Sequence, residues 1–383
     1  MDFNYTQDQQ QFANAVRRWV EKDYGFEARR SIIRSDSGVS ERAWHALSEL
    51  GVLALPLPES VGGLGGTVMD MFIVMEELGR GLVVEPVLST AMAAEFLRLS
   101  GGHTALLEEV GAGKLTLACA LGERQSRHEL FDVATSARLH DGGYVLDGAK
   151  AIALHGAQAG YVIVSARTSG GQREPDGISL FLVPANAAGL TARGYRTIDG
   201  LRAADIELRN VRVPSSAMLS AQGNGWGMLE AVTDYGIVLA CGEAIGAMEA
   251  LNAATLEYLK TRQQFGVPIG SFQALQHRMV DMAIHLAQAR AVATLAAAEM
   301  STPLDAGDRE RLASAAKVRA GQAMKFISQQ AVQLHGGMGL SDELAVSHYV
   351  KRLTVIEAML GDTDHHLARF SSQPHFLNGV DRP

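Results

Sequence analysis

Two short segments in the last third of the sequence carry residue types that can do binding chemistry. The segment TRQQFGVPIGSFQALQH (Thr261–His277) contains Arg262, and a guanidinium fork suits phosphate oxygens. The segment AVQLHGGMGL (Ala331–Leu340) contains adjacent glycines, which permit a close approach of the backbone because they have no Cβ. Each feature alone has a plain structural interpretation, an exposed charge at a helix end and a helix-terminating turn. Their joint occurrence in one helical region makes them candidates for a binding site.

Histidines and acids near the end of the chain offer a second possible chemistry. The run DTDHH (362–366) resembles a set of metal ligands. His365 and His366 are adjacent, however, and adjacent helical residues diverge by roughly 100°. We therefore predict no metal site, and we expect His277 and His335 to be hydrogen-bonded interface residues rather than catalysts.

Three zones of different texture must position these residues. The chain up to about Lys114 has helical periodicity, with Thr6 as the first N-cap, and residues 115–214 consist of short β-prone runs separated by turns. From about Gly225 to Phe370 the helical period returns in four long segments with short connections, which predicts a bundle. The predicted domains are residues 1–114, 115–216 and 217–375, followed by a tail at 376–383.

The composition excludes several classes of protein. The chain has 383 residues, 47% of them hydrophobic, and a formal net charge of -8. This length predicts two to three compact units, and the acidic balance argues against a nucleic-acid binder. The start, MDFNYTQDQQ, lacks the basic and apolar regions of a secretory signal, and no stretch of about 18 apolar residues is free of charges. We therefore expect a cytoplasmic protein without a membrane span.

The order of helical domain, β domain and bundle, combined with the motifs, resembles the acyl-CoA dehydrogenase family from end to end. The motifs are Arg-x-x-Phe-Gly…Gln in Thr261–His277, Gln-x-x-Gly-Gly-x-Gly in Ala331–Leu340, and the opening FNYTQDQQQFANAV. More narrowly, runs such as FEARR, VSART and GDTDHHLAR are similar to the small subunit of a two-subunit member, pimeloyl-CoA dehydrogenase. The fold class implied is α+β, with an N-terminal α-helical domain, a middle β-barrel domain and a C-terminal four-helix bundle.

The resemblance implies FAD-dependent α,β-desaturation of an acyl-CoA thioester, as in fatty acid degradation. A carboxylate base removes the α-proton, and a hydride moves from the β-carbon to the flavin. In the family, FAD lies across a subunit interface, and the neighbouring subunit grips its pyrophosphate and adenine. Here Arg262 would pair with the pyrophosphate and Phe265 would pack near the adenylate half. The residues that match this grip are Arg262, Phe265, Gln273, Gln333, Gly336 and Gly337.

The residues that would hold this chain's own flavin are replaced. The family's Thr-Glu-Pro-x-x-Gly-Ser-Asp aligns with GERQSRHEL, where only Glu123 survives. The family's Trp-Ile-Thr, which stacks on and hydrogen bonds the isoalloxazine, aligns with Ile152–Leu154. Those aliphatic side chains cannot donate to the flavin ring.

The catalytic base is also missing at both of the family's usual positions, which align with Leu360 and Gly236. Asp362 and Asp234 are the candidates for a relocated base, because each lies two residues from one of those positions. By helical geometry, Asp234 lies on a different face from Gly236. The other carboxylates nearby are Glu243 and Glu357.

The pattern of kept and lost residues predicts a small, non-catalytic subunit of a heteromeric acyl-CoA dehydrogenase. A catalytic partner would supply the base and the isoalloxazine site, in an assembly of two large and two small subunits with one FAD per pair. The resemblance implies an acyl-CoA substrate, with a dicarboxylic chain as one candidate, and an electron-transfer flavoprotein as acceptor. The alternatives are a homo-oligomeric dehydrogenase with a relocated base and a scaffold subunit without flavin. Helices Gly242–Leu256 and Ala287–Met300 are rich in apolar residues and are either core or assembly surface.

Overall fold

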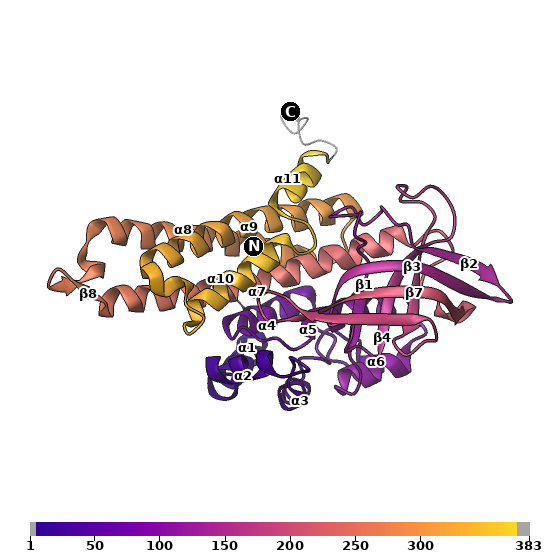
Figure 1. Cartoon of the computed structure of the whole chain (residues 1–383), viewed down its shortest axis with the longest axis horizontal. Helices are drawn as coiled ribbons and strands as arrows, with labels where there is room; N and C mark the ends of the chain where they lie inside the picture. The colour runs from indigo at the N-terminus through magenta and orange to yellow at the C-terminus, as the bar shows by residue number, and fades with distance from the viewer. Residues whose placement is uncertain (1–4, 374–383) are drawn as a thin grey trace. The chain divides into compact units, whose positions relative to one another are not determined.

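The computed structural model describes residues 5–373 of the chain and divides into two compact units. One unit consists of Met1–Arg30, Thr67–Val83 and Ile237–Pro383, and the other of Ser31–Gly66 and Val84–Gly236. Along the chain, helices are followed by strands and then by long helices (Figure 1). This order confirms the predicted fold class. The predicted tail at 376–383 lies outside the described residues.

The first helices begin where the sequence places caps. Thr6 caps α1 through a capping box with Gln9, and Thr67 caps α4 in the same way with Asp70. These caps satisfy N–H groups that a helix leaves unpaired at its start. The helices before the sheet are α1 (Gln7–Asp23), α2 (Phe26–Arg34), α3 (Glu41–Glu49), η1 (Glu59–Val61), α4 (Val68–Arg80), α5 (Val87–Ser100) and α6 (Thr104–Gly111).

The β region forms a single sheet, seven-stranded within the described residues, in the order β1-β4-β2-β3-β7-β6, with β5 paired to β4. The β3–β7 ladder is antiparallel and shifts register between Lys150 and Ala153, so β3 bends next to Ile152. The strands are β1 (Leu117–Ala120), β2 (Ser136–His140), β3 (Gly143–Leu154), β4 (Tyr161–Arg167), β5 (Ile178–Pro184), β6 (Leu190–Arg196) and β7 (Arg202–Pro214).

The C-terminal region is built on long helices joined by short connections. Figure 1 shows α8 and α9 running side by side, with the β8–β9 hairpin at one end of α8. The elements are η2 (Ser215–Ala217), α7 (Trp226–Thr261), β8 (Gln263–Gln264), β9 (Val267–Pro268), η3 (Ile269–Ser271), α8 (Gln273–Glu299), α9 (Ala306–His335), η4 (Gly336–Leu340), α10 (Ala345–Ala358) and α11 (Thr363–Ser371).

The fourth predicted helix is in fact two helices, α10 and α11. The break falls at Leu360 and Gly361, whose φ angles are 57° and 102°. A helix cannot continue through left-handed residues. The break therefore creates a turn at Leu360, one of the two positions that align with the catalytic base of the family.

Helices α4 and α7 approach closely because glycines line their contact. A Cβ at Gly79 would lie 2.0 Å from the carbonyl oxygen of Glu243, and one at Gly246 would lie 1.7 Å from that of Glu76. Real Cβ atoms do not come so close to backbone, so only glycine fits at either position. The contact fixes the start of the bundle against α4.

Among the described residues, α7 alone is long and apolar enough to cross a membrane by length and composition. Its most apolar 18-residue window is 72% buried inside the protein. Helices in the core of a globular protein have the same character. Burial also shows that the predicted apolar stretch beginning at Gly242 is core as far as Met248.

Candidate cofactor-binding site

The residues predicted to grip the cofactor all lie in one unit, at the ends of α7 and α9 and the start of α8. We call these six residues the clamp: Arg262, Phe265, Gln273, Gln333, Gly336 and Gly337. All six are exposed. Because they are exposed, these residues can contact a ligand or another subunit.

The arginine side of the clamp is a tight hairpin after α7. The backbone N–H of Arg262 donates to the carbonyl of Tyr258 over 2.8 Å, and the Arg262 carbonyl accepts from the N–H of Ile269 over 2.8 Å. Within residues 5–373, the guanidinium of Arg262 has no hydrogen-bond or ion-pair partner. The hairpin fixes the backbone of this residue and leaves its five donors for a ligand.

Phe265 sits at the tip of this hairpin in an unusual conformation. Its φ is 54° and that of Gly266 is 79°, as a type I′ turn requires at both central positions. The Phe265 side chain is 91% exposed, and its nearest ring is that of Phe272, 6.2 Å away between centroids. A bulky residue held left-handed and in solvent costs stability. Such a cost points to a binding role for this ring.

The glycine side of the clamp is the turn η4, which follows α9. Gly336 has a φ of 59°, and a Cβ at Gly336 or Gly337 would meet nothing within 4 Å. Gly339 differs, since its Cβ would lie 2.8 Å from the carbonyl oxygen of Val332. The turn therefore folds back on α9 through Gly339 and presents an open backbone at the first two glycines. An anionic or planar ligand can approach that backbone.

An aromatic pair that sequence reasoning missed brings the two sides together. Tyr258, one turn before Arg262, stacks on His335, the last residue of α9, with ring centroids 4.4 Å apart. His335 is buried, and its Nδ1–H donates to the carbonyl of Ala331 over 2.8 Å. Burial lowers the pKa of this imidazole. The signal available in the sequence was an aromatic residue next to each motif.

In the β domain, the residue kept from the family's flavin motif is buried rather than exposed. Glu123 is buried and forms an ion pair with Lys150 at 2.7 Å. The same carboxylate accepts from the N–H groups of Ala134 and Thr135 at 2.9 and 3.0 Å. Burial alone would raise the pKa of Glu123, but the Lys150 ammonium and the hydrogen bonds from Gln125 and Thr135 lower it to about 2. Glu123, the one residue of the family motif that is kept, therefore forms a buried structural ion pair with Lys150.

Lys150 is the other residue that sequence reasoning missed. Its ammonium is fully buried and donates to Glu123, to the hydroxyl of Ser165 over 2.9 Å and to the carbonyl of Leu121 over 3.4 Å. The available signal was a lysine flanked by the apolar residues of AKAIAL, because lysine is buried in a sheet only when it is paired. This pair holds the segment after β1 against β3 and β4.

The segment aligned with Trp-Ile-Thr does not fit an isoalloxazine. Ile152 has a φ of 56° and is 66% exposed, and its N–H donates to Asp205 over 3.4 Å. Asp205 also pairs with Arg124 at 2.9 Å and accepts from Tyr195 at 3.4 Å. No side chain of Ile152–Leu154 can hydrogen bond a flavin ring, as the sequence predicted.

The turn that carries Leu360 is held by two buried groups. The Lys317 ammonium donates to the carbonyls of Glu357, Met359 and Gly361 over 3.1, 2.5 and 2.5 Å. His366 Nε2 donates to the Leu360 carbonyl over 2.8 Å. Burial lowers the pKa of Lys317 to about 8 and that of His366 to about 3. The turn is thus rigidly positioned although it carries no acid at Leu360.

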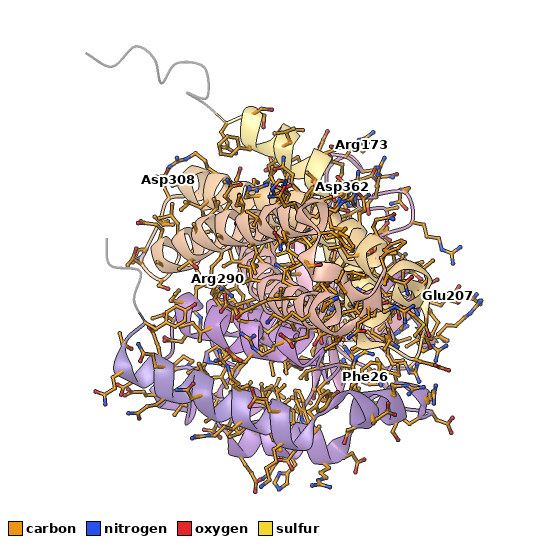
Figure 2. The ribbon with its side chains drawn as sticks, turned by 90° about the vertical axis from the view of Figure 1, so that its left-hand side faces the viewer. Phe26, Arg173, Glu207, Arg290, Asp308 and Asp362 are labelled. Carbon is orange, nitrogen blue, oxygen red and sulfur yellow. The ribbon has the colours of Figure 1, made fainter. Side chains whose placement is uncertain are left out.

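The four carboxylates that the sequence offers near the two aligned base positions are hydrogen-bonded or buried. Asp362 caps α11 by accepting from the N–H of His365 over 2.8 Å, and Glu357 accepts from the N–H and hydroxyl of Thr363. Asp234 is fully buried within α7. Glu243 accepts from both ends of the Arg352 fork over 2.6 and 2.8 Å. Figure 2 shows Asp362 near the base of α11.

The described residues contain no group of three or more His, Cys, Asp or Glu side chains that could hold a metal ion. In the DTDHH run, the two histidine rings are nearly perpendicular, with an interplanar angle of 89°. His366 is directed into the protein toward Leu360 and Ser314. The divergence expected from adjacent helical positions is therefore present.

Comparison with known proteins agrees with this architecture. Residues 6–120, 118–211 and 223–372 match the models for the acyl-CoA dehydrogenase N-terminal, middle and C-terminal domains. Acyl-CoA dehydrogenase IpdE2 of Mycobacterium tuberculosis is 30% identical over 96% of this chain and 97% of its own. The probable acyl-CoA dehydrogenase YngJ of Bacillus subtilis is 27% identical over 95% of this chain and 97% of its own.

Two solved structures extend the likeness. A variant of the Tcur3481–Tcur3483 steroid ACAD has a TM-score of 0.85 at 26% identity, covering 98% of this chain and 99% of that one. The ChsE4–ChsE5 complex of Mycobacterium tuberculosis has a TM-score of 0.87 at 24% identity, covering 100% of both chains, and it shows the same fold.

Fold and site together define a flavoprotein oxidoreductase architecture. The chain belongs to the acyl-CoA dehydrogenase family, whose members are FAD-dependent enzymes that act on CH–CH bonds. The clamp residues fit the pyrophosphate and adenylate half of FAD, because they offer a free guanidinium, an exposed ring and an open glycine backbone. The β domain segment does not fit the isoalloxazine half.

Proposed function

We propose that this chain is the small, base-lacking subunit of a heteromeric acyl-CoA dehydrogenase and that it grips FAD bound in the partner subunit. The observation that carries the proposal is an asymmetry between two regions. The clamp is exposed and complete, whereas the aligned base positions are Leu360 and Gly236 and the flavin-stacking position is Ile152. A chain with this asymmetry can complete another subunit's site but lacks the groups for its own.

Each clamp residue has a defined task in this proposal. Arg262 binds the pyrophosphate through charge-assisted hydrogen bonds, and Phe265 packs against the adenylate half. The backbone at Gly336 and Gly337 approaches the adenine and pyrophosphate, with Gln273 and Gln333 as polar contacts. Bound FAD supplies the hydride acceptor for α,β-desaturation of an acyl-CoA thioester.

The partner would supply the carboxylate base and the isoalloxazine site. Support comes from the similar structures, since the Tcur3481–Tcur3483 and ChsE4–ChsE5 proteins are heteromeric members of the family. The narrower resemblance to the small subunit of pimeloyl-CoA dehydrogenase suggests a dicarboxylic acyl-CoA as substrate. An electron-transfer flavoprotein as acceptor and a cytoplasmic location belong to the same proposal.

The apolar surface that would meet the partner lies on α8. Val280 is 55% exposed and Ile284 is 47% exposed, one turn apart on the same face. They lie before the predicted Ala287–Met300 stretch, whose alanines at 289, 293, 296 and 297 are buried. The assembly surface is therefore expected on the face of α8 that carries Val280 and Ile284, next to the clamp and apart from the face that contacts α9.

The test is to purify the chain alone and together with its catalytic partner. We expect the chain alone to be colourless and inactive in dye-linked oxidation of acyl-CoA esters. In the assembly, Arg262→Ala should weaken FAD binding about 10- to 100-fold, because each lost charge-assisted hydrogen bond contributes about 1.5–3 kcal/mol. Arg278→Ala is a matched control, since that arginine is exposed on α8 and bonds Gln330.

Two outcomes would contradict the proposal in different ways. If the chain alone is yellow and active and Asp362→Asn abolishes the activity, the protein is a homo-oligomeric dehydrogenase with a relocated base. If Arg262→Ala leaves the FAD content of the assembly unchanged, the chain is a scaffold that does not touch the cofactor.

A further inference from the structure

The clamp consists of two parts that are far apart in the sequence. Arg262 follows α7, and Gly336 follows α9, more than 70 residues later. A single pyrophosphate can be gripped from both sides only if their separation is fixed. Something in the fold must therefore connect the end of α7 to the start of η4.

Tyr258 is connected to the arginine side through the backbone. Its carbonyl accepts from the N–H of Arg262 over 2.8 Å, which continues the helical ladder up to the arginine. Its ring leaves α7 and stacks on His335 with centroids 4.4 Å apart and an interplanar angle of 27°. The Tyr258 hydroxyl also points to the His335 carbonyl at 3.5 Å. The orientation of this ring is thus tied to the position of Arg262.

His335 is connected to the glycine side. It is the last residue of α9 and directly precedes Gly336, and its own hydrogen bond to Ala331 fixes the ring against the helix. A Cβ at Gly339 would lie 3.1 Å from the Cβ of His335, so the turn wraps around this side chain. The imidazole therefore lies between Tyr258 and the turn that exposes Gly336 and Gly337.

We propose that Tyr258 and His335 are positioning residues that set the distance between the arginine and glycine sides of the clamp. This inference rests on the proposed function and deepens it, because it names what organises the cofactor grip before FAD arrives. Neither ring needs to touch the cofactor. Their contribution is stacking, which depends on an aromatic ring at each position rather than on the hydroxyl or the imidazole proton.

The experiment measures FAD dissociation constants of the assembled protein for variants with and without rings. Tyr258→Leu and His335→Ala should each weaken FAD binding about three- to tenfold, the range expected when one aromatic stack is lost. Tyr258→Phe and His335→Phe keep the rings and should stay within about twofold of the unmodified protein. This rescue separates positioning from loss of a particular polar group.

His285 provides a matched control within the same unit. It stacks on Phe326 with centroids 4.1 Å apart, between α8 and α9 and outside the clamp. His285→Ala should lower the melting temperature about as much as His335→Ala and leave FAD binding unchanged. If His335→Ala fails to assemble, Tyr258→Leu carries the test, because Tyr258 is only half-buried.

The outcomes distinguish this inference from the proposed function. If the ring-less variants bind FAD normally while Arg262→Ala does not, the positioning role is wrong and the clamp stands. If His285→Ala weakens FAD binding as much as His335→Ala, the effect is general destabilisation and the positioning role is again wrong. If Arg262→Ala also binds FAD normally, the proposed function itself fails.

Discussion

The polar groups of the clamp are exposed, whereas the acid kept in the flavin-motif region of the β domain is buried and paired. In the clamp, Arg262 and the N-terminal glycines of η4 face outward, and Phe265 is held in a costly conformation in solvent. In the β domain, Glu123 and Lys150 are buried and satisfy each other. Unsatisfied, exposed groups are available to a ligand, whereas buried pairs are available only to the fold.

The turn at Leu360 resembles the β domain in this respect. Lys317 and His366 use their hydrogen bonds to hold backbone carbonyls of the turn. The turn is therefore held in place although Leu360 carries no acid. The difference agrees with the proposed function, in which this chain binds a cofactor held by a partner subunit.

The largest effect is expected from breaking the buried pair in the β domain. Lys150→Met should lower the free energy of unfolding by about 3–5 kcal/mol, because the Glu123 carboxylate is left buried without its counter-charge. Chemical denaturation measures this loss. The double variant Lys150→Met with Glu123→Leu should lose much less. A loss below about 1 kcal/mol for the single variant would show that the pair of Lys150 and Glu123 does not hold this region together.

The next effect concerns the turn at Leu360. Lys317→Met leaves three carbonyls without their donor and should lower the free energy of unfolding by about 2–3 kcal/mol. Hydrogen exchange of the backbone between Met359 and Thr363 should speed up as well. Lys325→Met is the control, since this lysine lies on the same helix and is exposed. Equal effects of the two variants would contradict the role given to Lys317.

A pH series separates Glu123 from a less well satisfied acid, Glu76. Burial raises the pKa of Glu76 to about 7, and its Oε1 lies 3.5 Å from the Nε of Arg290. The pKa of Glu76 is higher in the folded protein, about 7, than in the unfolded chain, 4.5, so the folded protein binds the proton more tightly. This contribution to stability is fully present below pH 4.5 and is lost as the pH rises through 7. Stability should therefore fall with rising pH in this window, by up to about 1.4 kcal/mol per pH unit. Glu76→Gln should remove this slope in thermal unfolding, and an unchanged slope would contradict the assignment.

The smallest expected effect on stability has the opposite sign. Phe265→Gly relieves a left-handed phenylalanine and should raise the free energy of unfolding by up to about 1 kcal/mol. The same change removes the exposed ring and should weaken FAD binding in the assembly. Denaturation and FAD titration of one variant therefore move in opposite directions. If both fall, the strain at this turn does not serve binding.

Much of the fold follows from local sequence. Thr6 caps α1 as its hydroxyl and spacing predict, and the turn-separated β-prone runs correspond to the strands of the sheet. The fourth bundle helix was predicted as one helix and is two, because Leu360 has ordinary helix propensity and its left-handed turn is held by Lys317, by His366 and by the contact between Glu357 and Thr363. Local helix propensity cannot show that Lys317 donates to the carbonyls of Met359 and Gly361, which lie more than 40 residues further along the chain.

The sequence by itself, through its resemblance to the family, predicted which residues form the clamp and which replace the base and the flavin contacts, because motifs are read from residue types and their spacing. Only the tertiary structure decided what joins or occupies these positions. It placed Tyr258 on His335 and buried Lys150 against Glu123. Each of these contacts lies between residues that are brought together by packing, and packing depends on the whole of a unit rather than on any one segment.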